Sequence, residues 1–406
     1  MSKAKKLTAL CCLLYFTSYI TRLNYAASLS EIIHAMDITK SMASLAVTGS
    51  FITYGLGQLI SGPLGDRISP EKFIFSGLLA TAATNLLISF SGSIMMMTIL
   101  WCFNGFFQAM LWPPLVRIMA ENLSQTEYRK ACVNVSASAS LGTIAVYILV
   151  PFCIRFGGWR LGFIIPAVFA VLIAFVWILS TRHLTASAPD TQTDIIPSQS
   201  SENVHLFPMI VRSGALPIFV AIMLQGTLRD GLTTWMPSYI NDIYHMGTSV
   251  SILTTAILPL FSIFSIAFAS QLNTWVKSEL RAAVILFASA LTATCCLLPL
   301  FSSNALLSVL LMSIITGCMH GINMLLISRL PAYFEKYGCV STMSGIFNTF
   351  TYIGSAVSTY GIAALSENFG WPATIGSWAL IAALGIGFCV SAMKRWHYFF
   401  NYTSQS

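Results

Sequence analysis

Long apolar runs, separated by short polar loops, make up most of the chain. A helix needs about 20 mainly apolar residues to cross the hydrocarbon core of a bilayer. The chain holds twelve such runs, with approximate centres at Ser18, Thr53, Ala82, Gly105, Leu141, Phe169, Gly226, Phe261, Ser289, Thr316, Tyr352 and Leu384. The pattern predicts an all-α integral membrane protein with twelve transmembrane helices.

One polar segment interrupts this pattern near the middle of the chain. Residues 184–208, "LTASAPDTQTDIIPSQSSENVHLFP", are rich in Ser, Thr, Pro and Gln, a composition typical of a flexible linker. We therefore expect two six-helix halves, residues 1–183 and 212–406, joined by a linker over residues 184–211.

The charges are few and unevenly distributed. Only 9% of the residues are charged, against about 25% in soluble proteins. With the N-terminus inside, sixteen of the 21 Lys and Arg residues fall on the inner side and three on the outer side. The positive-inside rule then predicts a multi-pass protein of the cell membrane with both termini cytoplasmic. Topology accounts for the net charge of +7, so no nucleic-acid partner is expected.

No pattern in the sequence indicates catalysis. Its ten cysteines are scattered, which favours neither a disulfide framework nor a metal site. We see no nucleophile–base constellation, paired carboxylates or metal-ligand cluster at helical spacing. We expect neither an enzyme nor a protein with a cofactor or bound metal.

The two halves carry traces of an internal repeat. "RFGGWR" (155–160) follows the fifth run and "NFGWP" (368–372) follows the eleventh. Gly142 and Gly354 are 212 residues apart, as are Trp159 and Trp371. Parallel halves of this kind pack around a site near the middle of the membrane.

Two arginines fall inside predicted spans, Arg22 in the first and Arg229 in the seventh, at equivalent places in the repeat. An arginine at the centre of a membrane helix costs about 2.5–3.5 kcal/mol. Asp230 follows Arg229, but adjacent helical positions point about 100° apart, so we do not expect a clean ion pair. A negatively charged ligand bound by both arginines would explain them. The alternative is a structural role at a helix break.

The first span presents a polar face around its arginine. Tyr15, Ser18, Tyr19, Arg22 and Tyr25 recur at helical spacing. Tyr15 and Tyr19 lie deep in the span and are candidates for the ligand site. An anchoring role at the membrane interface fits Tyr25 better.

Other polar residues within the spans are candidates for ligand contact. Asn104, Gln108 and Trp112 share a face of the fourth span, where Pro113 and Pro114 predict a kink. Two further pairs share a face of the tenth and eleventh spans, namely His320 with Asn323 and Asn348 with Tyr352. We place Gln108, His320, Asn348 and Tyr352 in the substrate site. Hydrogen bonds between helices are the alternative.

The loop "SGPLGDRISPEK" (61–72) resembles the G-x-L-x-D-R signature of the major facilitator superfamily. Asp66 and Arg67 match its charged pair. We expect both to form charge-assisted bonds that latch the inner face in one conformation.

A narrower resemblance covers nearly the whole chain. "RLNYA" (22–26), "FFQAMLWPPLVRIM" (106–119) and "LRDGLTTWMPSYI" (228–240) are similar to segments of the organophosphate:phosphate antiporters. The resemblance implies that Arg22 and Arg229 bind a substrate phosphate. It also implies that Tyr15, Tyr19 and Tyr352 line the site, and that His320 replaces a tyrosine of the family.

This chain departs from that family at two charged positions. Glycerol-phosphate transporters carry a lysine where this chain has Gln58, and a histidine where Ala139 is nearest. A carboxylate would suit a site of two arginines, because guanidinium binds it through a planar fork. The resemblance therefore leaves the choice between a phosphate ester and a carboxylate open.

Together these patterns predict a secondary active transporter, expected to be a monomer, that moves a small organic anion by alternating access. Proton-coupled carriers often use a buried Asp or Glu. Asp230 is the only acid that we place within a span, so exchange of anions is favoured. A proton-coupled symporter that uses His320 or Asp230 is one alternative. A membrane sensor of phosphorylated sugars that does not transport is another.

Overall fold

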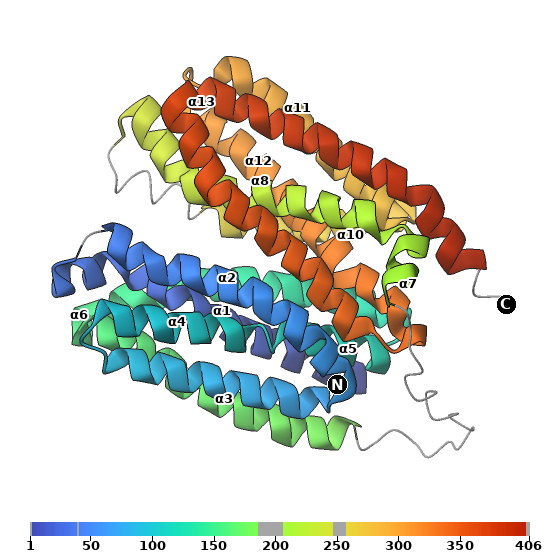
Figure 1. Cartoon of the computed structure of the whole chain (residues 1–406), viewed down its shortest axis with the longest axis horizontal. Coiled ribbons are helices and arrows are strands. Elements are labelled where there is room, and N and C mark those ends of the chain that lie inside the picture. Colours follow the sequence, from blue (N-terminus) through green and yellow to red (C-terminus); the bar gives the residue numbers. More distant parts are fainter. Residues whose placement is uncertain (1, 39, 186–205, 247–256, 403–406) are drawn as a thin grey trace. The chain divides into compact units, whose positions relative to one another are not determined.

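Helices dominate the residues that the computed structural model describes, namely 2–38, 40–185, 206–246 and 257–402 (Figure 1). Their bounds are α1 (Lys3–Met36), α2 (Lys40–Arg67), α3 (Pro70–Ser89), α4 (Ile94–Gln108), α5 (Trp112–Asn122), α6 (Gln125–Thr185), α7 (Leu206–Ser213), α8 (Ala215–Tyr244), α10 (Ile257–Val276), α11 (Glu279–Leu300), α12 (Ala305–Asn323) and α13 (Val340–Tyr402). A π-helical turn (Met324–Arg329) and a 3₁₀ helix (Leu330–Tyr337) continue α12. Most of the predicted linker, residues 184–211, lies outside the described residues.

The helices account for the predicted number of spans. Eight helical stretches of the described chain are long and apolar enough to cross a membrane. Two helices hold two passages each, because α6 bends at Gly157 and Gly158 and α13 bends at Gly370. α1 and α2 are long enough to cross but carry polar faces. Counted in this way, the described helices provide twelve passages, and the predicted all-α membrane fold is confirmed.

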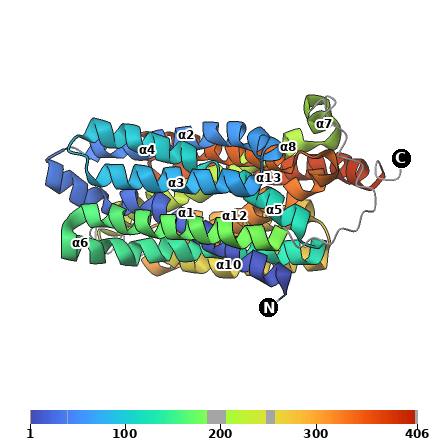
Figure 2. The same ribbon diagram turned by 90° about the horizontal axis from the view of Figure 1, so that it is seen from below.

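The chain packs as two units. The first comprises residues 1–204 with 331–349, and the second comprises residues 205–330 with 350–406. In the first unit α1 and α3 both pack along α6, and α2 packs along α4 (Figures 1 and 2). In the second unit α12 packs against α8, α10 and α11. The exact limits of the two halves stay a prediction, since segment 331–349 clusters with the first unit.

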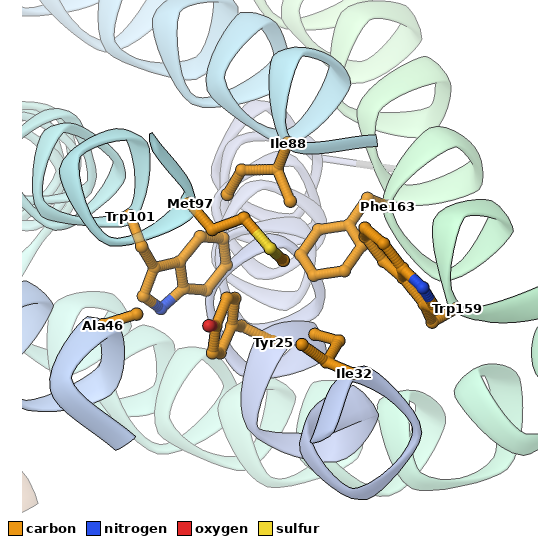
Figure 3. Packing of buried hydrophobic residues seen from close by; sticks show 8 residues of the cluster. All are labelled: Tyr25, Ile32, Ala46, Ile88, Met97, Trp101, Trp159 and Phe163. Carbon is orange, nitrogen blue, oxygen red and sulfur yellow. The ribbon is translucent and has the colours of Figure 1, made fainter. Parts of the chain in front are cut away.

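An aromatic cluster fills one part of the first unit (Figure 3). The ring of Tyr25 lies 5.1 Å from that of Trp101, and Trp101 lies 6.0 Å from Phe163. Tyr25 is completely buried, and its hydroxyl donates to the carbonyl of Ala43 over 3.4 Å. The predicted role of Tyr25 as an interfacial anchor is therefore wrong. The ring faces inward because bulky neighbours on α4 and α6 provide an apolar environment for it.

The internal repeat is present in the backbone. Gly158 in α6 has a φ of 71° and Gly370 in α13 has a φ of 75°, so each bend uses the left-handed conformation that glycine tolerates. Each glycine is followed by a buried tryptophan, Trp159 or Trp371. The two bends therefore share both their geometry and their local sequence.

The same repeat is present in a close helix contact of each unit. A Cβ atom at Gly142 of α6 would lie 2.8 Å from the carbonyl oxygen of Phe16 on α1. A Cβ atom at Gly354 of α13 would collide with the carbonyl oxygen of Met223 on α8. Phe16 and Met223 each precede an arginine, Arg22 or Arg229, by six positions. Both arginines therefore follow an equivalent helix crossing.

Candidate functional site

Arg22 is half-buried against aromatic rings of the first unit. Its guanidinium carbon lies 4.5 Å from the centroid of the Tyr19 ring on the same helix. It lies 5.0 Å from the centroid of the Tyr54 ring on α2. A cation over the face of an aromatic ring is attracted by the quadrupole of that ring. The two tyrosines therefore stabilise the charge of Arg22 without supplying a negative charge.

The rings around Arg22 extend along α1 toward its N-terminus. The Tyr15 ring lies 5.2 Å from that of Tyr19 and 4.7 Å from that of Trp112, the first residue of α5. Tyr15, Tyr19, Arg22, Tyr54 and Trp112 form what we call the Arg22 cluster. The sequence predicted the three residues on α1, and it noted Trp112 only as sharing a face with Gln108. Tyr54 was missed, although it lies one helical turn before Gln58.

Asn348 reaches the Arg22 cluster from the start of α13. Its amide nitrogen donates to the hydroxyl of Tyr54 over 3.5 Å, the outer limit of a hydrogen bond. Thr349 donates to the carbonyl of Gly55 over 3.1 Å, which holds the two helices together at this point. Asn348 thus meets the cluster through Tyr54, and its contact with a substrate stays a prediction.

Gln108 is buried at the end of α4, and both ends of its amide bind α1. The hydroxyl of Ser18 donates to its oxygen over 2.7 Å, and its nitrogen donates to the hydroxyl of Thr21 over 2.8 Å. In the structure Gln108 joins two helices, and substrate contact remains a prediction for it. Thr21 directly precedes Arg22, and Ser18 lies one helical turn before it. The hydrogen bonds of Gln108 therefore also fix the part of α1 that carries the arginine.

The predicted kink in the fourth span is a break between α4 and α5. α4 ends at Gln108, and α5 begins at Trp112, followed by Pro113 and Pro114. The carbonyl of Ala109 accepts hydrogen bonds from Ser61 over 2.7 Å and from the amide nitrogen of Gln58 over 3.4 Å. Gln58 is fully buried there and satisfies a backbone carbonyl within the break. Its influence on ligand choice stays a prediction.

Arg229 forms an ion pair with its neighbour Asp230. Its Nε atom donates to Oδ1 over 2.6 Å, and its Nη2 atom donates to Oδ2 over 2.8 Å. The expectation that these neighbours would not pair cleanly is wrong. The Cβ atoms of adjacent residues do diverge, but the arginine side chain is long enough to curve back, and its planar fork matches the carboxylate.

Two other helices of the second unit contribute to the surroundings of this pair. Asn323 of α12 accepts from Nη1 of Arg229 over 2.7 Å, and Ser355 of α13 donates to Oδ2 of Asp230. His320 lies one turn before Asn323 and interacts electrostatically with both members of the pair. Arg229, Asp230, His320, Asn323 and Ser355 form what we call the Arg229 cluster.

Tyr352 lies on α13 one helical turn before Ser355, and only 9% of its surface is exposed. The second unit thus gathers Arg229 and His320 and places Tyr352 on a neighbouring turn. Ser355 was missed by the sequence reasoning, since a serine within an apolar run carries little signal. Its spacing of three from Tyr352 could have placed it on the same face.

The predicted latch residues differ in their contacts. The carboxylate of Asp66 accepts from the backbone amides of Ser341 over 2.8 Å and Thr342 over 2.7 Å, at the start of α13. Arg67 is exposed, and the basic residue that binds this loop is Arg117, which donates to the carbonyl of Gly65 over 2.7 Å. A latch formed by Asp66 and Arg67 together stays a prediction.

A two-unit fold of long apolar helices defines a polytopic helical membrane protein. The sequence profile of the Major Facilitator Superfamily matches residues 11–359, and the chain belongs to this superfamily. Its fold is also that of the proton:xylose symporter XylE, with a TM-score of 0.75, 11% identity and coverage of 99% of this chain and 96% of that one.

Several proteins of known or assigned role are similar in sequence to the chain at 21–29% identity. A "probable hexose phosphate transport protein" of Chlamydia muridarum is 21% identical over 395 residues, covering 88% of this chain and 84% of that protein. The "membrane sensor protein UhpC" of Escherichia coli (strain K12) is 29% identical over 177 residues, 43% of this chain and 40% of that protein. These relatives support the resemblance to the organophosphate:phosphate antiporters.

Proposed function

We propose that this chain is a secondary active transporter that moves a small organic anion, a carboxylate or a phosphate ester, across the cell membrane by exchange. Arg22 and Arg229 bind the anion together, with Tyr15, Tyr19, His320 and Tyr352 around it. The observation that carries the proposal is the equivalence of the two arginines. Each lies within a membrane helix, six positions after a close helix crossing that the repeat places in both halves.

Exchange follows from the charge of the site. Arg22, Arg229 and Asp230 together give the empty site a net charge of +1, and closing the site around that charge is unfavourable because it must be desolvated. A bound anion compensates this charge and allows the two halves to rock around it. We place both termini on the cytoplasmic side, as the distribution of Lys and Arg favours, and treat the transporter as a monomer.

Counterflow in proteoliposomes tests this function. Vesicles loaded with inorganic phosphate, hexose phosphates, glycerol 3-phosphate or carboxylates are diluted into a trace of the same labelled anion. We expect transient accumulation of label for at least one anion class, only when the vesicle is preloaded. Uptake that needs an imposed proton gradient and no internal anion would replace exchange with proton coupling through His320 or Asp230.

A sensor that does not transport is the second candidate, and the similarity to UhpC favours it. A sensor and a carrier both gain thermal stability from a ligand, because the ligand binds only the folded state. Only the carrier moves label across the bilayer. A ligand-induced rise in melting temperature without counterflow would therefore assign the chain to the sensors.

A further inference from the structure

Asp230 already occupies the part of Arg229 that is best suited to an anion. The Nε and Nη2 atoms form the edge of the guanidinium that binds a carboxylate or phosphate through two parallel hydrogen bonds. In this structure both donate to Asp230, at 2.6 and 2.8 Å. An anion that takes the same edge must displace Asp230, and one that approaches elsewhere meets a charge already balanced.

The position of the Asp230 carboxylate is fixed by the neighbouring helices. Ser355 of α13 donates a third hydrogen bond to it, and Asn323 of α12 holds the opposite side of Arg229. The other described aspartate of α8, Asp242, is exposed and accepts from Trp371 over 3.3 Å. Asp230 is therefore a built part of the Arg229 cluster, and Asp242 offers a matched control on the same helix.

We propose that Asp230 is a specificity-determining residue, an internal anion that lowers the charge of the site by one and disfavours doubly charged ligands. The inference rests on the proposed function, in which Arg229 binds the transported anion. Singly charged groups, such as a carboxylate or a sulfonate, are then preferred over the dianion of a phosphate monoester.

The physical basis is the dependence of repulsion on ligand charge. Whatever the other groups of the site contribute, Asp230 adds one negative charge next to the ligand. Coulomb repulsion from it is twice as large for a dianion as for a monoanion at the same position.

Sulfate and methanesulfonate form a suitable pair of probes. Both are tetrahedral sulfur oxyanions, they differ by one charge, and neither titrates near neutral pH. Their dissociation constants are measured on the purified full-length chain at pH 8 and constant ionic strength. Histidine, with an ordinary pKa of about 6.5, is mostly neutral at that pH.

We expect Asp230→Asn to strengthen sulfate binding at least about tenfold more than methanesulfonate binding, because one repulsive charge is removed. Asp242→Asn should leave the ratio of the two constants as in the wild type. An unchanged ratio in Asp230→Asn, or loss of both responses in a folded protein, would overturn the inference. If Asp230→Asn does not fold, Asp230→Ser removes the same charge with a smaller side chain and is judged by the same ratio.

The failure of this inference can be told apart from failure of the proposed site. Arg229→Gln should abolish the response to both probes in the wild-type background and in Asp230→Asn. If binding of both probes survives Arg229→Gln, the anion site itself is wrongly placed. If Arg229→Gln abolishes binding of both probes while Asp230→Asn leaves the ratio of their dissociation constants unchanged, the anion site is correctly placed and Asp230 plays no part in selectivity.

Discussion

Arg22 and Arg229 occupy equivalent places in the repeat, yet the two units accommodate them differently. Each arginine follows a crossing at which a glycine of another helix meets a backbone carbonyl. Arg22 lies against the faces of Tyr19 and Tyr54, whereas Arg229 is held by Asp230 and Asn323. The comparison shows that the repeat preserves the backbone that presents each cation, while the neighbouring side chains have diverged.

This difference separates the two arginines energetically. Aromatic rings stabilise a cation by about 0.5–1 kcal/mol at exposed sites and more when desolvated. A carboxylate also stabilises a cation, but once the cation is removed the carboxylate is left as an uncompensated charge that destabilises the fold. The unit with the ion pair should therefore be more sensitive to loss of its arginine than the unit with the rings.

The largest expected effect is on transport, where the two arginines should behave alike. Arg22→Ala and Arg229→Ala should each lower counterflow by about 100-fold or more, because each removes charge-assisted hydrogen bonds to the anion. Arg22→Lys and Arg229→Lys keep the charge but lose the fork, so a weaker defect is expected. Near-normal exchange in one alanine variant would restrict the anion site to the other unit.

Next in size is the effect of filling the two helix crossings. Gly142→Val and Gly354→Val should each destabilise the protein by about 3 kcal/mol, the upper end for overpacking, because the obstacle is a backbone carbonyl. Gly376→Val is the control, since a Cβ atom at Gly376 meets nothing within 4 Å. Thermal unfolding in detergent measures all three. A mild effect at only one crossing would show that the two units do not rely equally on the repeat.

A smaller effect should distinguish the arginines in the absence of ligand. Arg229→Ala should destabilise the apo protein by about 2 kcal/mol, because it leaves the carboxylate of Asp230 without its ion-pair partner. The expected loss of stability is modest because 33% of the Asp230 side chain is exposed and solvent screens its charge. Arg22→Ala should have a smaller effect on apo stability, about 1 kcal/mol, which is the size of the cation–ring contacts with Tyr19 and Tyr54 that it removes.

The double variant Arg229→Ala/Asp230→Ala provides the control for this prediction. It should regain most of the stability lost in Arg229→Ala, because no unpaired carboxylate remains. Equal destabilisation by the single and the double variant would show that Arg229 is needed for packing. A collapse of apo stability in Arg22→Ala would likewise make that arginine structural.

The smallest expected effect concerns the rings of the Arg22 cluster. Tyr54→Phe keeps the aromatic face and should change the apparent affinity for the anion by less than about twofold. Tyr54→Ala removes the face together with the packing of a buried ring, and the part of its cost that comes from the contact with Arg22 should be about 1 kcal/mol. A double-mutant cycle between Tyr54→Ala and Arg22→Ala, followed by thermal unfolding, isolates the coupling. Additive effects of the two substitutions would show that the Tyr54 ring does not stabilise Arg22.

Much of the fold and part of the site could be predicted from the sequence. Twelve apolar runs define twelve passages, because a bilayer admits few alternatives to a helix. Arg22 and Arg229 were conspicuous because of the cost of a charge in that position. The offset of 212 residues between Gly142 and Gly354 predicted a repeat that the helix crossings confirm.

The side-chain partners could not be predicted in the same way. Asp230 was expected to diverge from Arg229, since helical spacing describes Cβ directions and neglects the reach of a long side chain. Tyr25 lies on the same face as Tyr19 in sequence, but it packs into an aromatic cluster built by α4 and α6. Tyr54 and Ser355 come from helices that tertiary packing brings near, and helical spacing within a span does not show which other helix it will contact.

The two hydrogen bonds that Asp66 accepts at the start of α13 have a consequence for the speed of a carrier. A carboxylate at a helix N-terminus interacts favourably with the unpaired amides and the positive end of the helix dipole. Hydrogen bonds to a charged group contribute about 1.5–3 kcal/mol each, so a conformation that has even one is weighted at least about tenfold over one that lacks it. In the proposed alternating-access cycle the transporter leaves that conformation once per turnover. Asp66 is therefore expected to set the maximum rate of exchange, while the concentration of anion that half-saturates the carrier reflects the arginines.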